Sequence, residues 1–186
     1  SPVAAKAGVP QGYPLRRFTP GEPALGAPVV IDSAGAGRIA HFLSTALAVD
    51  YQLLSVEAET ERGALVFDAT GIEEPEQLRE LYDFFHPQLR NLAPNARLLV
   101  IGTTPEKTAT IDARIAARAL EGFTRSLAKE MRKGGTVNLI WVEPGATAEI
   151  ESTVRFFLSG KSAFVDGQVV RVKATTAEAD ADLSLI

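Results

Sequence analysis

Continuous apolar runs alternate with segments of helical periodicity along most of this chain, and that alternation limits the folds it can adopt. Runs such as ALVF (64–67), RLLVIG (97–102) and VNLIWV (137–142) lack the regular polar–apolar alternation of a half-exposed strand. Strands of this kind are buried on both faces, as in parallel sheets with helices on either side. We therefore predict strands at 29–32, 52–56, 64–68, 97–102, 136–142 and 168–172, and helices at 37–48, 75–92, 111–133 and 149–158.

The order of these elements predicts the fold class. Strands that alternate with helices form a doubly wound parallel sheet with right-handed crossovers, which gives a three-layer α/β domain. At 186 residues the chain is long enough to bury one complete core. We expect a single α/β domain over residues 28–172, with an arm before it and a tail after it.

The two ends of the chain differ in composition from the centre. Residues 1–27 hold five prolines and four glycines, and proline fixes φ and lacks a backbone donor, so we predict an extended arm there. We expect Leu15 and Phe18 to attach part of this arm to a surface. Residues 173–186 are rich in Ala, Thr, Glu and Asp and have few apolar groups to bury, which predicts a tail or a linker.

Composition excludes several classes of chemistry and of partner. The chain has no cysteine, which excludes disulfides, thiolate nucleophiles and sulfur-bound metals. Its two histidines, His41 and His86, lie in separate segments, and its net charge is −4, so we expect neither a metal site nor nucleic acid as the main partner. No apolar run approaches the roughly 20 residues that cross a bilayer, and Ser1 opens no signal-peptide core. We expect a piece of a cytoplasmic protein with no membrane partner.

The segment 111–133 has two contrasting faces when it is drawn as a helix. At about 100° per residue, the apolar face is predicted to hold Ile115, Ala119, Phe123, Leu127 and Met131. The opposite face gathers five basic side chains, which are Arg114, Arg118, Arg125, Lys129 and Arg132. Gly122 leaves a notch at which another backbone could approach closely.

Several short segments occur here in an order that is known from one large family. They are LVFDATG at 65–71, FHPQLR at 85–90, IGT at 101–103, ALEGFTRSLAKE at 119–130, EPG at 143–145 and SAFVDGQV at 162–169. Together they resemble the motifs of the short-chain dehydrogenase/reductase (SDR) family, and the match extends over most of residues 28–172. The resemblance implies a Rossmann-like α/β domain, in agreement with the element pattern.

A subgroup of that family is similar in more detail. The Pro-rich arm, the LVFDATG strand, GTTPE at 102–106 and the ending KSAFVDGQV at 161–169 resemble the amino-terminal domain of high-molecular-weight 3-oxoacyl-acyl-carrier-protein reductases. In that subgroup a degenerate, flavodoxin-like domain precedes an intact SDR domain. The resemblance implies that a catalytic domain follows residues 173–186 and is a partner of this one. The parent protein would reduce 3-oxoacyl thioesters in fatty acid metabolism with NADH or NADPH.

The residues that carry the chemistry of SDR enzymes are missing from the matching positions. Alignment of the ALEGFTRSLAKE segment with the family pattern places Ala113 at the position of the tyrosine and Ala117 at that of the lysine, while Thr103 stands at that of the serine. The reduction needs a phenol to protonate the developing alkoxide and an ammonium group to lower the pKa of that phenol. A methyl group can do neither. We predict that this segment alone is not an enzyme, although its parent is.

The first strand-to-helix turn holds an incomplete cofactor motif. The family pattern Thr-Gly-x-x-x-Gly-x-Gly holds the pyrophosphate with backbone amides at a helix amino terminus. Gly35 and Gly37 match its last two glycines, but the first is absent, and Asp32 puts a negative charge at the strand end. We expect these glycines to serve a tight turn, with no cofactor in this segment. A flavin- or nucleotide-binding flavodoxin-like module that uses this turn is the alternative.

Two segments of the family pattern are shortened. Only a few residues separate the strand at 52–56 from that at 64–68, where SDR enzymes have a further helix and strand. After Pro144 and Gly145 the chain enters the next helix without the segment that covers the substrate in SDR enzymes. The loss of the third strand implies the flavodoxin-like strand order 2-1-3-4-5-6.

Two non-catalytic roles follow from the resemblance. SDR proteins pack the helices equivalent to 75–92 and 111–133 against a partner subunit, so we expect a homodimer. The apolar residues available for such an interface are Leu78, Leu81, Phe84, Phe85, Leu89, Phe123 and Leu127. The second role is docking of the acidic acyl carrier protein on the five basic residues of 111–133. The alternative for those residues is a solvated face balanced by Glu121 and Glu130.

Overall fold

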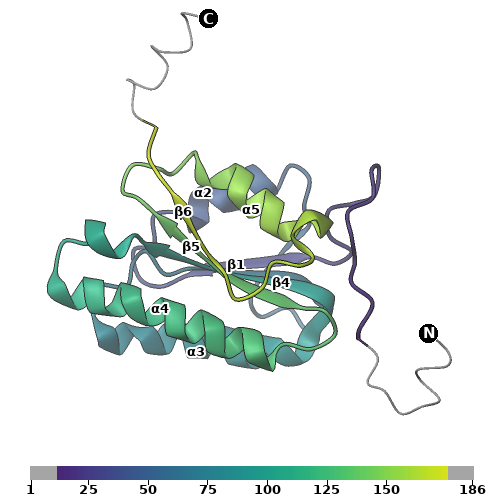
Figure 1. The fold of residues 1–186 in the computed structure, drawn as a ribbon, viewed down its shortest axis with the longest axis horizontal. Helices are drawn as coiled ribbons and strands as arrows, with labels where there is room; N and C mark the ends of the chain where they lie inside the picture. The colour runs from purple at the N-terminus through teal and green to yellow at the C-terminus, as the bar shows by residue number, and fades with distance from the viewer. Residues whose placement is uncertain (1–11, 176–186) are drawn as a thin grey trace, which may run out of the picture.

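The computed structural model of this protein describes residues 12–175, which form one α/β domain around a parallel sheet. The strands are β1 (Val29–Ser33), β2 (Leu53–Leu54), β3 (Arg62–Asp68), β4 (Leu92–Thr103), β5 (Thr136–Val142) and β6 (Val169–Val172). The helices are α2 (Ala40–Leu47), α3 (Arg79–Gln88), α4 (Ile111–Glu130) and α5 (Ile150–Leu158). The sheet order β2-β1-β3-β4-β5-β6 confirms the predicted order 2-1-3-4-5-6 and the three-layer fold (Figure 1).

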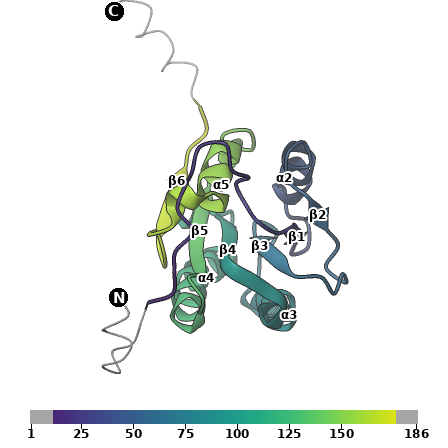
Figure 2. The same cartoon turned by 90° about the vertical axis from the view of Figure 1, so that its right-hand side faces the viewer.

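The helices cover the two faces of the sheet in pairs. α3 and α4 lie on one face, and α2 and α5 lie on the other (Figures 1 and 2). The core under α3 and α4 is rich in aromatic residues, including Phe67 and Phe85, whereas the core under α2 and α5 is mainly aliphatic, with Leu43 and Ile101. β3 and β5 are buried along their whole length, as the continuous apolar runs predicted.

The predicted helix at 75–92 is wrong at both ends. A 3-10 turn occupies Pro75–Leu78 before α3, and a second one, Leu89–Asn91, follows it. Leu92 is therefore the first residue of β4 and not the last residue of a helix. The sequence pattern did not predict the amino-terminal part of β4, because this part is not a regular strand. Asn95 has a φ of 60°, and the pairing of β4 with β3 shifts its register nearby.

Helix α4 ends earlier than predicted and turns a different face to the sheet. It stops at Glu130, because Met131 has an extended backbone with φ −65° and ψ 141°. The side chains that it buries are Ala113, Ala116, Ala117, Leu120, Thr124 and Leu127. Ile115, which was predicted on the apolar face, is 53 % exposed. The prediction was wrong for Ile115 and Ala119, which are exposed, and right for Leu127, because the face that meets the sheet is rotated toward a row of small alanines.

The described part of the arm, residues 12–27, contains no helix or strand, makes a turn in which Glu22 N–H donates to Thr19 O, and is attached to the domain. The backbone N–H of Arg16 donates to Asn95 Oδ1 at 3.0 Å, and Lys161 Nζ lies 4.8 Å from the centre of the Phe18 ring. Of the two residues that were expected to attach the arm, Leu15 is half-buried and Phe18 is 51 % exposed. The predicted arm residues 1–11 and tail residues 176–186 lie outside the described part of the chain.

Candidate functional site

The carboxyl ends of neighbouring strands bring several polar groups together at one edge of the sheet. β1 and β3 end side by side at Ser33 and Asp68, and β4 and β5 end side by side at Thr103 and Val142. The turn from β1 to α2 lies next to them. Open α/β sheets bind their ligands at this edge, so it is the candidate functional site.

Asp68 caps the amino terminus of α2 from the neighbouring strand. Its Oδ2 accepts hydrogen bonds from the backbone N–H groups of Ile39 at 2.7 Å and Ala40 at 2.8 Å. Its Oδ1 accepts from the N–H of Thr70 at 2.9 Å and from the Thr70 hydroxyl at 2.6 Å. Asp68 is fully buried, and a buried carboxylate needs partners of this kind. Its charge also faces the positive end of the α2 dipole.

Other backbone amides of the turn before α2 are bonded within the protein as well. The bonds run from Ala34 N to Asp68 O at 3.0 Å, from Gly37 N to Ala34 O at 3.1 Å, and from Arg38 N to Thr70 Oγ1 at 3.0 Å. A Rossmann-type turn offers amides in these places to a phosphate group. Here the protein itself uses them.

The two glycines of the predicted cofactor motif allow this turn to pack tightly. Gly35 has a φ of +47°, and a Cβ on Gly37 would lie 2.6 Å from Asp68 Oδ2. Gly71 lies against the same turn, since its Cβ would be 2.6 Å from Gly37 N and 2.8 Å from Ala36 N. The predicted start of the helix at residue 37 was wrong because residues 37–39 complete the turn, and α2 begins only at Ala40.

The side chain of Arg38 crosses the ends of the central strands. Its Nη1 donates to Thr103 Oγ1 at 3.0 Å, and its Nη2 donates to the carbonyl of Val142 at 3.0 Å. Burial lowers the pKa of the Arg38 guanidinium below its ordinary value, and the charge of Asp68 offsets part of this effect. Arg38 therefore fills space over the ends of β4 and β5.

The positions predicted from the SDR pattern provide no acid at this edge. Ala113 and Ala117 lie on the buried side of α4, with exposed fractions of 7 % and 6 %, and alanine has no proton to donate. Thr103 keeps a hydroxyl, and its oxygen accepts the hydrogen bond from Arg38. These three positions therefore supply none of the general acid chemistry that carbonyl reduction requires.

The residues at this edge do not fit a nicotinamide dinucleotide. A pyrophosphate at the amino terminus of α2 would meet the carboxylate of Asp68, and like charges at such short range repel strongly where water is excluded. The sequence predicted that Asp32 would oppose a phosphate. The structure gives that position to Asp68, while Asp32 Oδ1 accepts from the N–H of Ser33 at 2.8 Å.

Four of the five predicted basic residues share one exposed stripe of α4, which consists of Arg114, Arg118, Arg125 and Lys129. Arg132 was predicted on the same stripe, but it lies beyond the end of the helix. Arg125 pairs with Glu121 at 2.6 Å. Among residues 12–175, Arg114 and Lys129 form no ion pair within 4.0 Å.

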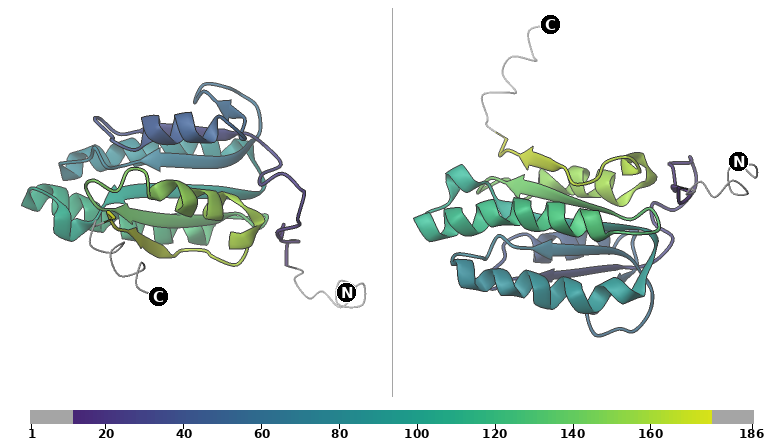
Figure 3. Two further views of the ribbon diagram at one scale, coloured as in Figure 1. Left: turned by 90° about the horizontal axis from the view of Figure 1, so that it is seen from above. Right: turned by 60° about the horizontal axis from the view of Figure 1, so that its bottom comes forward.

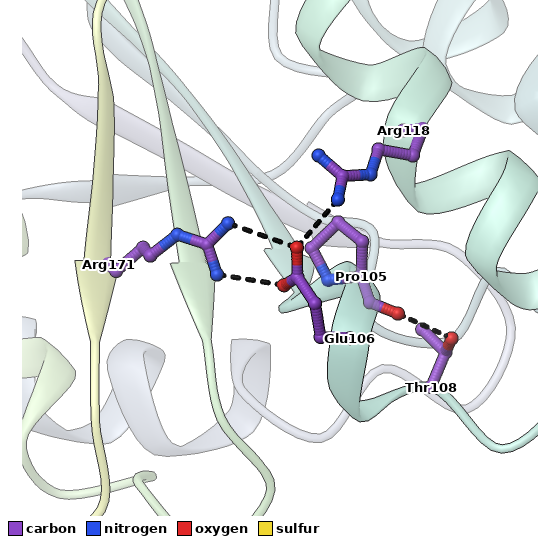
Figure 4. A network of polar contacts seen from close by, with 5 residues as sticks. All are labelled: Pro105, Glu106, Thr108, Arg118 and Arg171. Carbon is purple, nitrogen blue, oxygen red and sulfur yellow. Dashed lines mark hydrogen bonds and ion pairs between the residues drawn. The ribbon is translucent and has the colours of Figure 1, made fainter.

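Glu106 lies between two arginines beside this stripe (Figure 4). Its Oε1 is 2.6 Å from Arg118 Nη2, and its Oε2 is 2.8 Å from Arg171 Nη1. The two guanidinium groups also lie over the ring of Trp141, at 5.6 Å and 4.7 Å from its centre. Hydrogen bonds from Arg171 lower the pKa of Glu106 from 4.5 to about 2. Arg118 thus belongs to a partly exposed cluster of charged side chains that connects α4 to β6.

A hollow of about 220 Å³ lies between α3 and α4, which run side by side on one face (Figure 3). Its lining comprises Tyr82, Phe85, His86, Leu89, Phe123, Ser126, Leu127 and Glu130. Tyr82 is 56 % exposed and its ring stacks on that of His86 at 4.7 Å. A Cβ on Gly122 would have no atom within 4 Å, so the predicted notch is open.

The apolar residues predicted for a helical interface divide into two groups. Leu81, Phe84, Phe85 and Leu127 are buried in the core of the domain itself. Leu78, Leu89 and Phe123 are only partly buried. The exposed apolar surface of this face therefore depends on Tyr82 and Ile115, which the sequence did not assign to the interface.

Sequence reasoning missed Arg38 and the role of Asp68. A signal existed for Asp68, since a charge at the end of an otherwise apolar buried strand requires a specific partner. Arg38 had no comparable signal, because it is one polar residue in a polar turn.

Over residues 12–175, none of the helices has the length and apolar character to cross a bilayer. The same residues contain no group of three or more His, Cys, Asp or Glu side chains that could hold a metal ion.

Comparison with known proteins supports the fold. No family model and no curated protein matches the sequence. A double mutant of a short-chain dehydrogenase/reductase from Serratia marcescens has a TM-score of 0.63 at 14% identity, over 82% of this chain and 98% of that one. Aldohexose dehydrogenase from Thermoplasma acidophilum has a TM-score of 0.60 at 13% identity, over 79% and 92%. The structure of BdcA in complex with NADPH has a TM-score of 0.63 at 15% identity, over 82% of this chain and 95% of that one. The chain thus has an SDR-like, Rossmann-type fold.

Proposed function

We propose that this is the non-catalytic amino-terminal domain of a 3-oxoacyl-acyl-carrier-protein reductase and that its function is assembly. The observation that carries the proposal is the exposed apolar face of α3 and α4. The parent protein would reduce 3-oxoacyl thioesters with NADH or NADPH in a separate, carboxy-terminal SDR domain. The α3/α4 face would hold two copies of the chain together as a homodimer.

Several features of this face support a contact with another protein. Tyr82 and Ile115 are each more than half exposed, and apolar groups gathered on one face of a domain mark interaction surfaces. Tyrosine is favoured in interfaces, because its ring offers a large contact area at low entropic cost. The open space at Gly122 permits close approach of a second helix. At the carboxyl ends of the strands, the side chains of Asp68 and Arg38 form hydrogen bonds within the protein. These bonds support the proposal of a non-catalytic role.

Ile115→Glu should abolish the homodimer. A buried, unpaired carboxylate costs several kcal/mol (on the order of 2–5) in an interface, so the variant should sediment as a monomer at concentrations where the original protein is a dimer. Sedimentation velocity over a range of micromolar concentrations measures both species.

Val49→Glu is the matched control for this variant. Val49 is also an exposed apolar residue, at 85 %, but it follows α2 on the other side of the sheet. Its replacement should leave the dimer intact. A protein that is monomeric at all concentrations, or an Ile115→Glu variant that still dimerises, would contradict the proposal.

Docking of acyl carrier protein is a second candidate function, favoured by Arg114 and Lys129 on α4, which form no ion pair with any other residue between 12 and 175. An acidic partner would be attracted to this stripe, and the attraction should weaken as salt rises. We expect Arg114→Glu/Lys129→Glu to reduce the affinity for carrier protein at least about tenfold at low salt. Isothermal titration calorimetry measures the affinity of each variant for carrier protein.

The control for docking is Arg79→Glu, which reverses an exposed charge on α3 that pairs with Asp83 at 3.5 Å. This change should leave carrier-protein affinity nearly unaltered. The absence of binding by the original protein at low salt, or an equal loss in both variants, would end the docking hypothesis.

A further inference from the structure

We infer that Asp68 is a built-in substitute for an anionic ligand. Its carboxylate occupies the anion position at the amino terminus of α2, and its removal would create a site for a small carboxylate such as formate. The inference concerns the sheet edge and not the α3/α4 face, so it can fail or hold independently of the assembly function.

The four hydrogen bonds around the Asp68 carboxylate are those of an anion site. Three donors are backbone amides, of Ile39, Ala40 and Thr70, and the fourth is the Thr70 hydroxyl, at distances between 2.6 and 2.9 Å. Hydrogen bonds to an ionised acceptor are roughly twice as strong as neutral ones. Amides at the start of a helix form the same kind of site for a phosphate in Rossmann-type folds.

Helix α2 depends on this carboxylate, because its own sequence does not cap it. Its N-cap residue is Ile39, which has no side-chain capping bond, and its first turn contains no acidic residue. A helix of this length leaves its first amides unsatisfied unless another group bonds to them. Asp68 reaches them from β3, 28 and 29 residues away in sequence.

The space around the carboxylate matches a single carboxylate group. A Cβ on Gly37 would lie 2.6 Å from Asp68 Oδ2, and Gly71 lies against the amides of Ala36 and Gly37. The backbone therefore approaches the carboxylate closely on the side of Gly37. Formate corresponds to the group that Asp68→Ala removes, so it matches the vacated volume.

The test is anion rescue of the variant Asp68→Ala. Removal of the carboxylate should lower the melting temperature by about 5–10 °C, since it leaves buried donors without partners. Addition of about 100 mM sodium formate should restore roughly a third or more of that loss, because a ligand that binds only the folded state raises its stability. The original protein should show no comparable response to formate.

Two carboxylate variants serve as controls. Asp32→Ala removes the carboxylate at the end of β1, which accepts only from Ser33 N, and its melting temperature should not respond to formate. Asp68→Asn retains the volume of the side chain, so formate has no space to enter and should not stabilise it.

Each outcome decides the inference. A folded Asp68→Ala variant that formate does not stabilise overturns it, as does an equal response of Asp68→Asn. If Asp68→Ala does not fold in buffer, refolding is attempted with formate present, and failure to recover the fold also overturns it. In the original protein, the amide NMR signals of Ile39, Ala40 and Thr70 should not move on addition of sodium formate, because the Asp68 carboxylate already binds these amides, and their movement would overturn the inference.

Discussion

Gly71→Ala should lower the free energy of unfolding by about 2–4 kcal/mol. The added Cβ would lie 2.6 Å from Gly37 N, 2.8 Å from Ala36 N and closer still to Ala34 O. All of these are backbone atoms, which cannot rotate away as the end of a flexible side chain can. Either the turn before α2 or the end of β3 would have to move, and with it the carboxylate of Asp68. Urea denaturation followed by circular dichroism measures the change.

Gly122→Ala is the matched control, because its Cβ would meet no atom within 4 Å. Alanine is favoured over glycine inside a helix by about 0.8–1.0 kcal/mol, so this variant should be slightly more stable at concentrations where the protein is monomeric. Equal losses in the two variants would mean that the contact of Gly71 with the turn is not tight.

The fold could be predicted from the sequence because its buried parallel strands consist of continuous apolar runs. β3 and β5 are each buried along their length, and no half-exposed strand would tolerate such composition. The strand order depended on one spacing, the short connection from residue 56 to residue 64, which leaves no space for a further helix and strand. Boundaries were less accurate where a local backbone feature intervened, as at Asn95 in β4.

The buried face of α4 could not be predicted from apolar periodicity alone. The pattern favoured Ile115 and Ala119, which are exposed, but the helix buries Ala113 and Leu120 instead. A Cβ on Gly102 would collide with the side chain of Leu120, so this leucine occupies the space that the glycine of β4 leaves free. That contact joins two distant segments, and periodicity within one helix contains no information about it.

The candidate site divides in the same way between local and distant features. The positions of Thr103, Ala113 and Ala117 came from a family resemblance, which also implied that the acid was missing. The occupation of the turn by Asp68 and Arg38 arises from contacts over 28 to 104 residues of sequence. Gly35 and Gly37 were correctly placed in a tight turn, and only the structure shows what the turn packs against.

Phe85→Ala should be more damaging than Gly71→Ala, with a loss of about 3–5 kcal/mol in the free energy of unfolding. Phe85 is 1 % exposed, and its ring lies 4.9 Å from Phe84, 5.6 Å from Phe123 and 6.1 Å from Phe67 between ring centres. Its removal leaves a cavity among rings that are fixed by α3, α4 and β3, so the surrounding structure can close it only in part. Chemical denaturation gives the loss.

Phe164→Ala separates this core effect from the loss of an aromatic ring as such. Phe164 is 71 % exposed, and the guanidinium of Arg17 lies 5.2 Å from the centre of its ring, so its replacement should cost about 0.5–1 kcal/mol. Because Phe85 also lines the hollow between α3 and α4, its removal should weaken the dimer as well as the fold, whereas Phe164→Ala should leave the dimer unchanged. A Phe85→Ala variant with nearly full stability would mean that contacts outside this aromatic group hold α3 in place. The aromatic group would then not be what keeps the α3/α4 face rigid.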